Sequence, residues 1–116
     1  MEHVPDDKKA MHEFCRILKR NGWAVLLVPL TDEERTYEDF SIDTDAGRTK
    51  AFGQYDHVRK YGKDYIDRLK YAGFNLVSAK LDELATVAEI ENLRLCEDQK
   101  LSDLTNTEIF CCVKGV

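Results

Sequence analysis

Apolar residues fall into stretches that predict alternating helices and strands. Residues 5–19 carry apolar side chains at helical spacing, and Asn21-Gly22 then ends this helix, because glycine accepts the left-handed conformation of a helix C-terminus. Residues 23–28 are apolar at every position, which is typical of a strand buried on both faces. Pro29 marks the end of that strand, since proline has no amide hydrogen to donate.

The second half of the chain repeats the pattern. Residues 63–72 form a second amphipathic stretch that Gly73 ends, and residues 74–79 follow as a strand. A strand, a helix and a strand in this order make a crossover unit, so we expect the two strands to be parallel. Residues 84–95 carry a weaker helical pattern, residues 96–106 read as a polar loop, and residues 107–113 predict the last strand. The sequence therefore predicts an α/β protein with a three-stranded mixed sheet.

An acidic, irregular segment separates the two halves. Residues 31–54 hold little apolar periodicity beyond a possible short helix at 45–52. A segment of this length inside a small domain is usually a lid, a binding loop or a disordered connection. We expect one domain over residues 1–116, with residues 31–62 as a lid-like insertion. A solvated connection and a lid are equally compatible with the composition.

The end of this segment holds the candidate binding chemistry. Residues 52–62 are dense in aromatic and hydrogen-bonding side chains. Asp56, His57, Arg59 and Tyr61 could orient a polar substrate, and only His57 among them titrates near neutral pH. The plainer interpretation is that Tyr61 packs in the core and Arg59 pairs with an acid. The residue types by themselves favour that interpretation.

Composition excludes several classes of function. The chain has 116 residues, 43% of them hydrophobic and 34% charged, which is typical of a globular domain. Its formal net charge of −5 argues against nucleic-acid binding, and no apolar run is long enough to span a membrane. The acidic start differs from a signal peptide, so we expect a cytoplasmic protein. The four cysteines form no CxxC pair, and we expect no metal site from them.

Several segments, in order, resemble the second half of class I S-adenosylmethionine-dependent methyltransferases of the broad type 11 group. The resemblance covers nearly the whole chain, although Arg20-Asn21 stands where the family usually has Pro-Gly. The segments that carry it are residues 2–11, 18–29, 52–62, 69–74 and 108–114.

The resemblance implies a fold and a site. It implies an incomplete Rossmann-like sheet of three mixed strands, in the family's order 5-7-6, with the helices mainly on one face. It also makes Glu2 and His3 candidate contacts at the mouth of the active site, with His3 as the candidate cofactor-binding residue. His57, Arg59 and Tyr61 become candidate substrate-binding residues at the mouth of the active site, and His57 or His3 could act as a base. We assign no catalytic residue.

The cofactor-binding half of that family is absent from the sequence. None of the six glycines forms the GxGxG turn that lets the backbone approach S-adenosylmethionine. We therefore expect the C-terminal part of a methyltransferase that binds the cofactor weakly or not at all and is inactive alone, so its status as an enzyme is open. The alternative is a non-catalytic interaction module. In both cases we expect association with a second copy or with a complementing N-terminal half, which would supply the rest of a small-molecule site.

Overall fold

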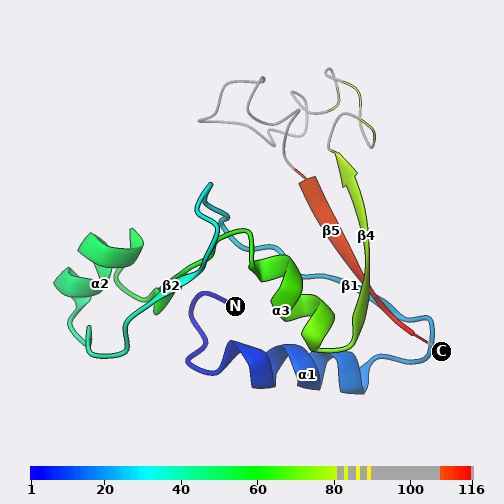
Figure 1. The fold of residues 1–116 in the computed structure, drawn as a ribbon, viewed down its shortest axis with the longest axis horizontal. Coiled ribbons are helices and arrows are strands. Elements are labelled where there is room, and N and C mark those ends of the chain that lie inside the picture. The colour runs from blue at the N-terminus through cyan, green and yellow to red at the C-terminus, as the bar shows by residue number, and fades with distance from the viewer. Residues whose placement is uncertain (81–82, 84–85, 87–88, 90–107, 116) are drawn as a thin grey trace.

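The computed structural model describes residues 1–80, 83, 86, 89 and 108–115 (Figure 1). Three helices and five strands follow one another along these residues. In chain order they are α1 (Asp7–Ile17), β1 (Trp23–Val25), β2 (Tyr37–Glu38), α2 (Asp45–Phe52), β3 (Arg59–Lys60), α3 (Tyr65–Tyr71), β4 (Phe74–Lys80) and β5 (Glu108–Lys114).

The first helix is shorter at both ends than the apolar pattern predicts. Asp6 caps its N-terminus by accepting a hydrogen bond from the Lys9 amide at 2.9 Å. The helix already ends at Ile17, and Asn21 takes the left-handed conformation that we expected of a glycine. At the C-terminal end, Lys114 of β5 donates to the carbonyl oxygens of Arg16 and Leu18. This lysine therefore joins the negative end of the helix to the last strand.

The two other predicted helices are confirmed. Helix α2 spans Asp45–Phe52, with Thr44 as its N-cap and Gly53 in the left-handed conformation at its C-cap. Helix α3 spans Tyr65–Tyr71, and Gly73 follows with a φ of 99°. The helix predicted at 84–95 and the loop predicted at 96–106 lie largely outside the described residues.

The main sheet has three strands in the order β1-β5-β4, and both pairings are antiparallel. Strand β5 lies in the middle: its Cys112 is opposite Ala24 on one side and Leu76 on the other. A second sheet consists of β2 and β3, which are also antiparallel. In Figure 1, β2 and α2 lie at the opposite end of the molecule from β4 and β5.

The expectation of an incomplete Rossmann-like sheet with mixed pairing is wrong. Strands β1 and β4 run in the same direction and β5 lies between them, as the order 5-7-6 implies, but both pairings are antiparallel, so the sheet is not mixed. Strand β1 is also shorter than predicted and is not buried on both faces. Its side chains alternate in exposure: Trp23 is 66% exposed, Ala24 is partly buried, and Val25 is 42% exposed.

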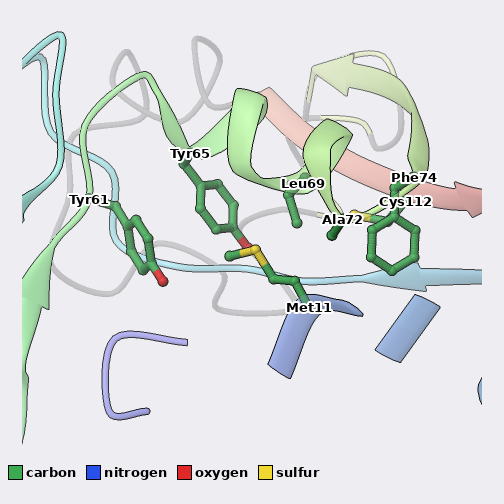
Figure 2. Close-up of a cluster of buried hydrophobic side chains, with 7 residues drawn as sticks. All are labelled: Met11, Tyr61, Tyr65, Leu69, Ala72, Phe74 and Cys112. Atoms are coloured by element: carbon green, nitrogen blue, oxygen red, sulfur yellow. The ribbon is translucent and has the colours of Figure 1, made fainter. Parts of the chain in front are cut away.

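The hydrophobic core lies between α1, α3 and one face of the main sheet (Figure 2). Met11 comes from α1, Tyr65 and Leu69 from α3, Phe74 from β4, and Cys112 from β5. The hydroxyl group of Tyr65 donates to the Leu26 carbonyl at 2.7 Å, so this buried polar group is satisfied. Burial raises the pKa of the Cys112 thiol to about 11, which keeps it a neutral core residue.

The opposite face of the main sheet is mostly apolar, and no helix within the described residues covers it. Residues that are directly opposite in neighbouring strands share a face. One row contains Trp23, Val113 and the polar Asn75, and the next contains Val25, Cys111 and Val77. Val77 is 59% exposed, which is high for an apolar residue of a sheet.

Gly62 lies where the irregular segment crosses the end of β3. A Cβ atom at this position would come within 2.6 Å of the Glu33 carbonyl oxygen and of the Arg35 backbone. Only glycine allows this close approach of two backbone segments. The two ends of the lid-like insertion are therefore packed against each other at Gly62.

We predict that Gly62→Ala lowers the free energy of unfolding by about 1–3 kcal/mol, because the added methyl group overpacks a backbone contact. Gly53→Ala is the matched control. Its added Cβ meets nothing within 4 Å, so only the strain of a positive φ applies, which costs about 1 kcal/mol. Urea unfolding of both variants measures the difference. An equal or smaller loss for Gly62→Ala contradicts the packing that we describe.

Candidate functional site

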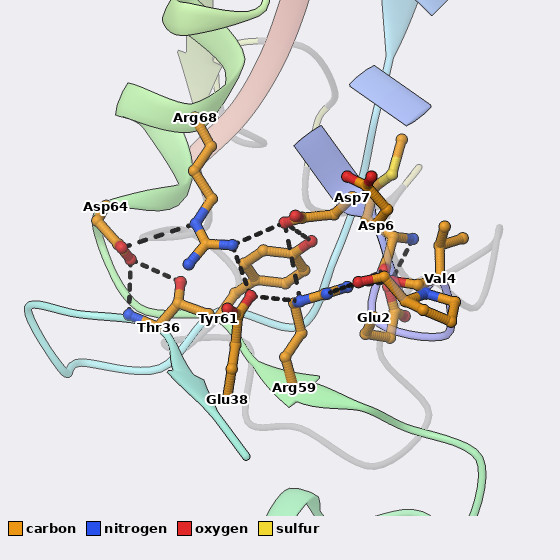
Figure 3. A network of polar contacts seen from close by, with 12 residues as sticks. Glu2, Val4, Asp6, Asp7, Thr36, Glu38, Arg59, Tyr61, Asp64 and Arg68 are labelled. Atoms are coloured by element: carbon orange, nitrogen blue, oxygen red, sulfur yellow. Dashed lines mark hydrogen bonds and ion pairs between the residues drawn. The ribbon is translucent and has the colours of Figure 1, made fainter. Parts of the chain in front are cut away.

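Arg59 is a buried arginine that binds the N-terminal segment. It lies in β3 and is only 1% exposed. Its Nη1 donates to the carbonyl oxygens of Met1 and Val4, and its Nη2 donates to the Pro5 carbonyl at 2.8 Å (Figure 3). A buried guanidinium is tolerated only where its donors find partners. Arg59 therefore fixes the path of the chain before α1.

Two acids neutralise this arginine and its neighbour. Glu38 of β2 accepts from Arg59 Nε at 2.7 Å and from Arg68 Nη1 at 2.6 Å. Asp7, the first residue of α1, accepts from Arg68 Nη1 at 2.9 Å and lies 3.8 Å from Arg59 Nε. Figure 3 shows the four side chains converging from β2, β3, α1 and α3. We call Asp7, Glu38, Arg59 and Arg68 the charge cluster.

Tyr61 completes the cluster as a hydrogen-bond donor. Its hydroxyl group donates to Asp7 at 2.7 Å, and both arginines lie near the face of its ring, at 5.7 and 5.8 Å from the centroid. Burial raises the pKa of Tyr61, and the negative charge of Asp7 raises it further. The phenol therefore stays protonated, so it acts as a donor and not as a base.

The carboxyl group of Asp7 stays ionised despite its burial. Burial by itself would raise the pKa of Asp7, but the hydrogen bonds from Tyr61 and Arg68 and the positive charge of Arg59 outweigh it, and the pKa is lowered overall. In Arg68 the opposite balance holds: burial would lower its pKa, but hydrogen bonds to Glu38 and Asp7 raise it. Asp7 is therefore ionised and Arg68 protonated at neutral pH.

A second group of polar side chains lies beside the N-terminal segment. Glu2, His3 and His57 each place one donor atom within 4.8 Å of the others. The rings of His3 and His57 meet edge to face, with 4.7 Å between their centroids. His3 Nδ1 lies 3.0 Å from Asp56 Oδ2, and the backbone amide of Val58 donates to the Glu2 carbonyl at 2.8 Å. We call Glu2, His3 and His57 the histidine cluster.

The structure thus divides the predicted site residues into two groups. His3, the predicted cofactor-binding residue, and His57, a predicted substrate-binding residue, lie together at a partly exposed position. Arg59 and Tyr61 are buried, and their polar atoms are already bound within the protein. Their assignment as substrate-binding residues stays a prediction. To bind a substrate, Arg59 and Tyr61 would have to give up these hydrogen bonds within the protein.

Sequence reasoning missed the part that Asp7, Glu38 and Arg68 play in the charge cluster. Asp7 fits the first turn of a helix equally well as an exposed residue, and Arg68 lies on a helix rich in charged side chains. The proposed pairing of Arg59 with an acid was the only available signal. It did not identify which acid, because the partners lie far apart in the sequence.

A separate hollow lies between the lid-like insertion and α3. Its volume is about 490 Å³, and it is lined by Glu34, Arg35, Asp64 and Asp67. Asp64 also accepts hydrogen bonds from the amide and hydroxyl groups of Thr36, at 2.7 and 2.6 Å. None of the predicted site residues lines this hollow.

Comparisons with models of protein families, with curated proteins and with solved structures found no match. The resemblance to methyltransferases therefore carries only the weight of the segments quoted above. Within the described residues, no helix has the length and apolar character needed to cross a membrane.

We predict that Arg59→Met lowers the free energy of unfolding by about 3–5 kcal/mol, because Glu38 and three carbonyl oxygens lose a buried partner. The control is Arg16→Met. That arginine is 68% exposed and, in the described part of the chain, its side chain pairs only with Glu13, so its loss costs less than about 1 kcal/mol. Urea denaturation compares the two, and equal losses would show that the buried arginine has no special role.

We also predict that Asp7 makes the free energy of unfolding depend on pH in the acid range. The folded-state pKa of Asp7 lies below its unfolded value, so its contribution is present above the unfolded pKa and is lost as the pH falls through the folded one. Unfolding by urea should become easier between neutral pH and about pH 3. The variant Asp7→Asn should have a lower free energy of unfolding at neutral pH, and that free energy should fall less steeply as the pH becomes acid. An equally steep fall in the variant would exclude Asp7 as its cause.

Proposed function

We propose that this chain is the C-terminal part of an S-adenosylmethionine-dependent methyltransferase and that it is inactive until a cofactor-binding partner completes it. The supporting observation is that two segments that carry the resemblance, 2–11 and 52–62, pack against each other. Arg59 and Val58 of the second segment bind backbone carbonyls of the first. Their polar side chains thereby converge in the histidine cluster, at the place where the resemblance puts cofactor and substrate contacts.

The proposal also explains the uncovered apolar surface. Strand β1 forms one edge of the main sheet, and no described strand pairs with its outer side. Trp23, Val25 and Val77 are exposed on the sheet face that no described helix covers. Open edges and apolar faces are association sites in proteins. We assign this surface to a partner that carries the glycine-rich turn missing from the sequence.

Within the completed enzyme, the chain would supply positioning more than chemistry. Methyl transfer from a sulfonium depends mainly on the alignment of donor and acceptor, with a base needed only to remove the acceptor's proton. By the resemblance, His57 or His3 is the candidate for that base. The substrate would be a small molecule, and we place the protein in the cytoplasm, in agreement with its free Cys15, Cys111 and Cys112.

The test combines this chain with the polypeptide encoded immediately upstream in the DNA. We expect that polypeptide to contain a strand, a glycine-rich turn and a helix. Calorimetry should detect no heat when S-adenosylmethionine is added to this chain alone at millimolar concentration, and binding should appear in the mixture. Micromolar binding by this chain alone, or an upstream sequence without the glycine-rich unit, would contradict the proposal.

A matched pair of variants tests the surface. Val77→Glu places a charge on the uncovered sheet face and should reduce complex formation by at least about tenfold, since a charge is costly to bury at an interface. Tyr71→Glu is the control, because Tyr71 is 76% exposed on α3, away from that face. Equal affinity of both variants for the partner would place the interface elsewhere.

The exposed residues of β1 favour a second candidate, a non-catalytic module that associates with itself. Trp23 of β1 and Leu27, just beyond the end of that strand, are each 66% exposed, so two copies could pair through β1 or through the apolar faces. Light scattering after size-exclusion chromatography distinguishes the candidates. A stable dimer that Val77→Glu dissociates, together with no cofactor binding in any mixture, would favour the module. A monomer at high concentration would exclude it.

A further inference from the structure

The histidine cluster has the composition of a transition-metal site. The donor atoms of Glu2, His3 and His57 lie within 4.8 Å of one another, and small side-chain rotations bring such atoms to the spacing of ligands around one ion. Two imidazole nitrogens and one carboxylate oxygen form a common set in zinc enzymes that keep an open position for water. We propose that Glu2, His3 and His57 bind a divalent transition-metal ion of the zinc type.

Asp56 orients one of these ligands. Its Oδ2 lies 3.0 Å from His3 Nδ1, which favours the tautomer that carries the ring proton on Nδ1. The lone pair of the ring is then on Nε2, which lies 3.6 Å from Glu2 Oε1. In metal sites, the ring nitrogen of a histidine that does not bind the ion commonly donates to a carboxylate, which fixes the orientation of the ring. Asp56 also keeps a buried Oδ1 without a hydrogen-bond partner, so it has further accepting capacity.

The backbone around the cluster is fixed before any ion binds. The amide of Val58, directly after His57, donates to the carbonyl of Glu2 at 2.8 Å. Arg59 then holds the carbonyl oxygens of Met1 and Val4, on either side of Glu2 and His3. Because the two segments are already joined, ion binding needs to order only the side chains.

Exposure and ligand type define the ion. The His3 side chain is 44% exposed, so an ion can reach the cluster and retain a water molecule. Imidazole ligands suit zinc, cobalt, nickel and iron, whereas magnesium and calcium prefer oxygen ligands throughout. The site should therefore discriminate strongly between Zn²⁺ and Mg²⁺. This inference does not depend on methyl transfer, since it concerns only the side chains of this chain.

The test titrates the full chain, freed of metal with a chelator, with Zn²⁺ in a calorimeter and with Co²⁺ in a spectrophotometer. We expect one ion per chain with micromolar affinity and no response to Mg²⁺. The cobalt complex should show visible bands of a four- or five-coordinate ion, without the near-ultraviolet absorption of a thiolate ligand. Thiolate absorption would assign the ion to a cysteine and overturn the proposal, as would the absence of binding.

Variants identify the ligands. His3→Ala and His57→Ala should each weaken Zn²⁺ binding by at least about tenfold, and Asp56→Asn should weaken it by about 10–100-fold through loss of the carboxylate that orients His3. The control is His12→Ala, because His12 lies on α1 and bonds only to the Lys8 carbonyl among the described residues. Circular dichroism verifies that each variant is folded. Unchanged affinity in His3→Ala, whose side chain is partly exposed and not in the core, would overturn the proposal.

Discussion

The burial of Arg59 constrains the structure more than any other feature. A buried guanidinium must find a partner for nearly every donor, since an unpaired one costs several kcal/mol. Arg59 meets this requirement with Glu38 and with three carbonyl oxygens of the N-terminal segment. Asp7 and Arg68 extend the cluster into α1 and α3. One set of charges thus determines where the N-terminal segment, the two-stranded sheet and two helices lie relative to one another.

The charge cluster also explains the position of the histidine cluster. Arg59 and His57 are near neighbours in the sequence, so the segment that Arg59 binds necessarily passes beside His57. His3 lies on that segment and meets the His57 ring. The buried charges are thus structural, and the partly exposed histidines next to them are available for ligands. The apolar sheet face forms a third region, whose exposed residues come from β1 and β4.

Helices could be predicted from the sequence better than the sheet could. The spacing of apolar residues located α1 and α3, and Gly73 marked the end of α3, because these signals are local. The mixed sheet was wrong because strand pairing is decided between distant residues. The uniformly apolar run at 23–28 suggested burial on both faces, but one of its faces stays uncovered by the described helices.

The candidate site was predictable only in part. His57 and Arg59 were identified because polar and aromatic residues are concentrated at 52–62, and the plainer interpretation of Arg59, an arginine paired with an acid, agrees with its salt bridge to Glu38. The contact between His3 and His57 could not be derived, since no local pattern connects them. The same holds for β2 and β3, whose two-residue strands are too short to leave a periodic signal.

The most direct test of this account measures the contact between the two histidine rings by nuclear Overhauser effects in solution. Arg59 holds the N-terminal segment and thereby brings His3 to His57. We expect cross-peaks between the two rings in the unmodified chain. In Arg59→Met these should disappear, while cross-peaks within the core, such as those between Tyr65 and Met11, persist. Ring contacts that survive the loss of Arg59, or that are missing from the unmodified chain, would contradict this account.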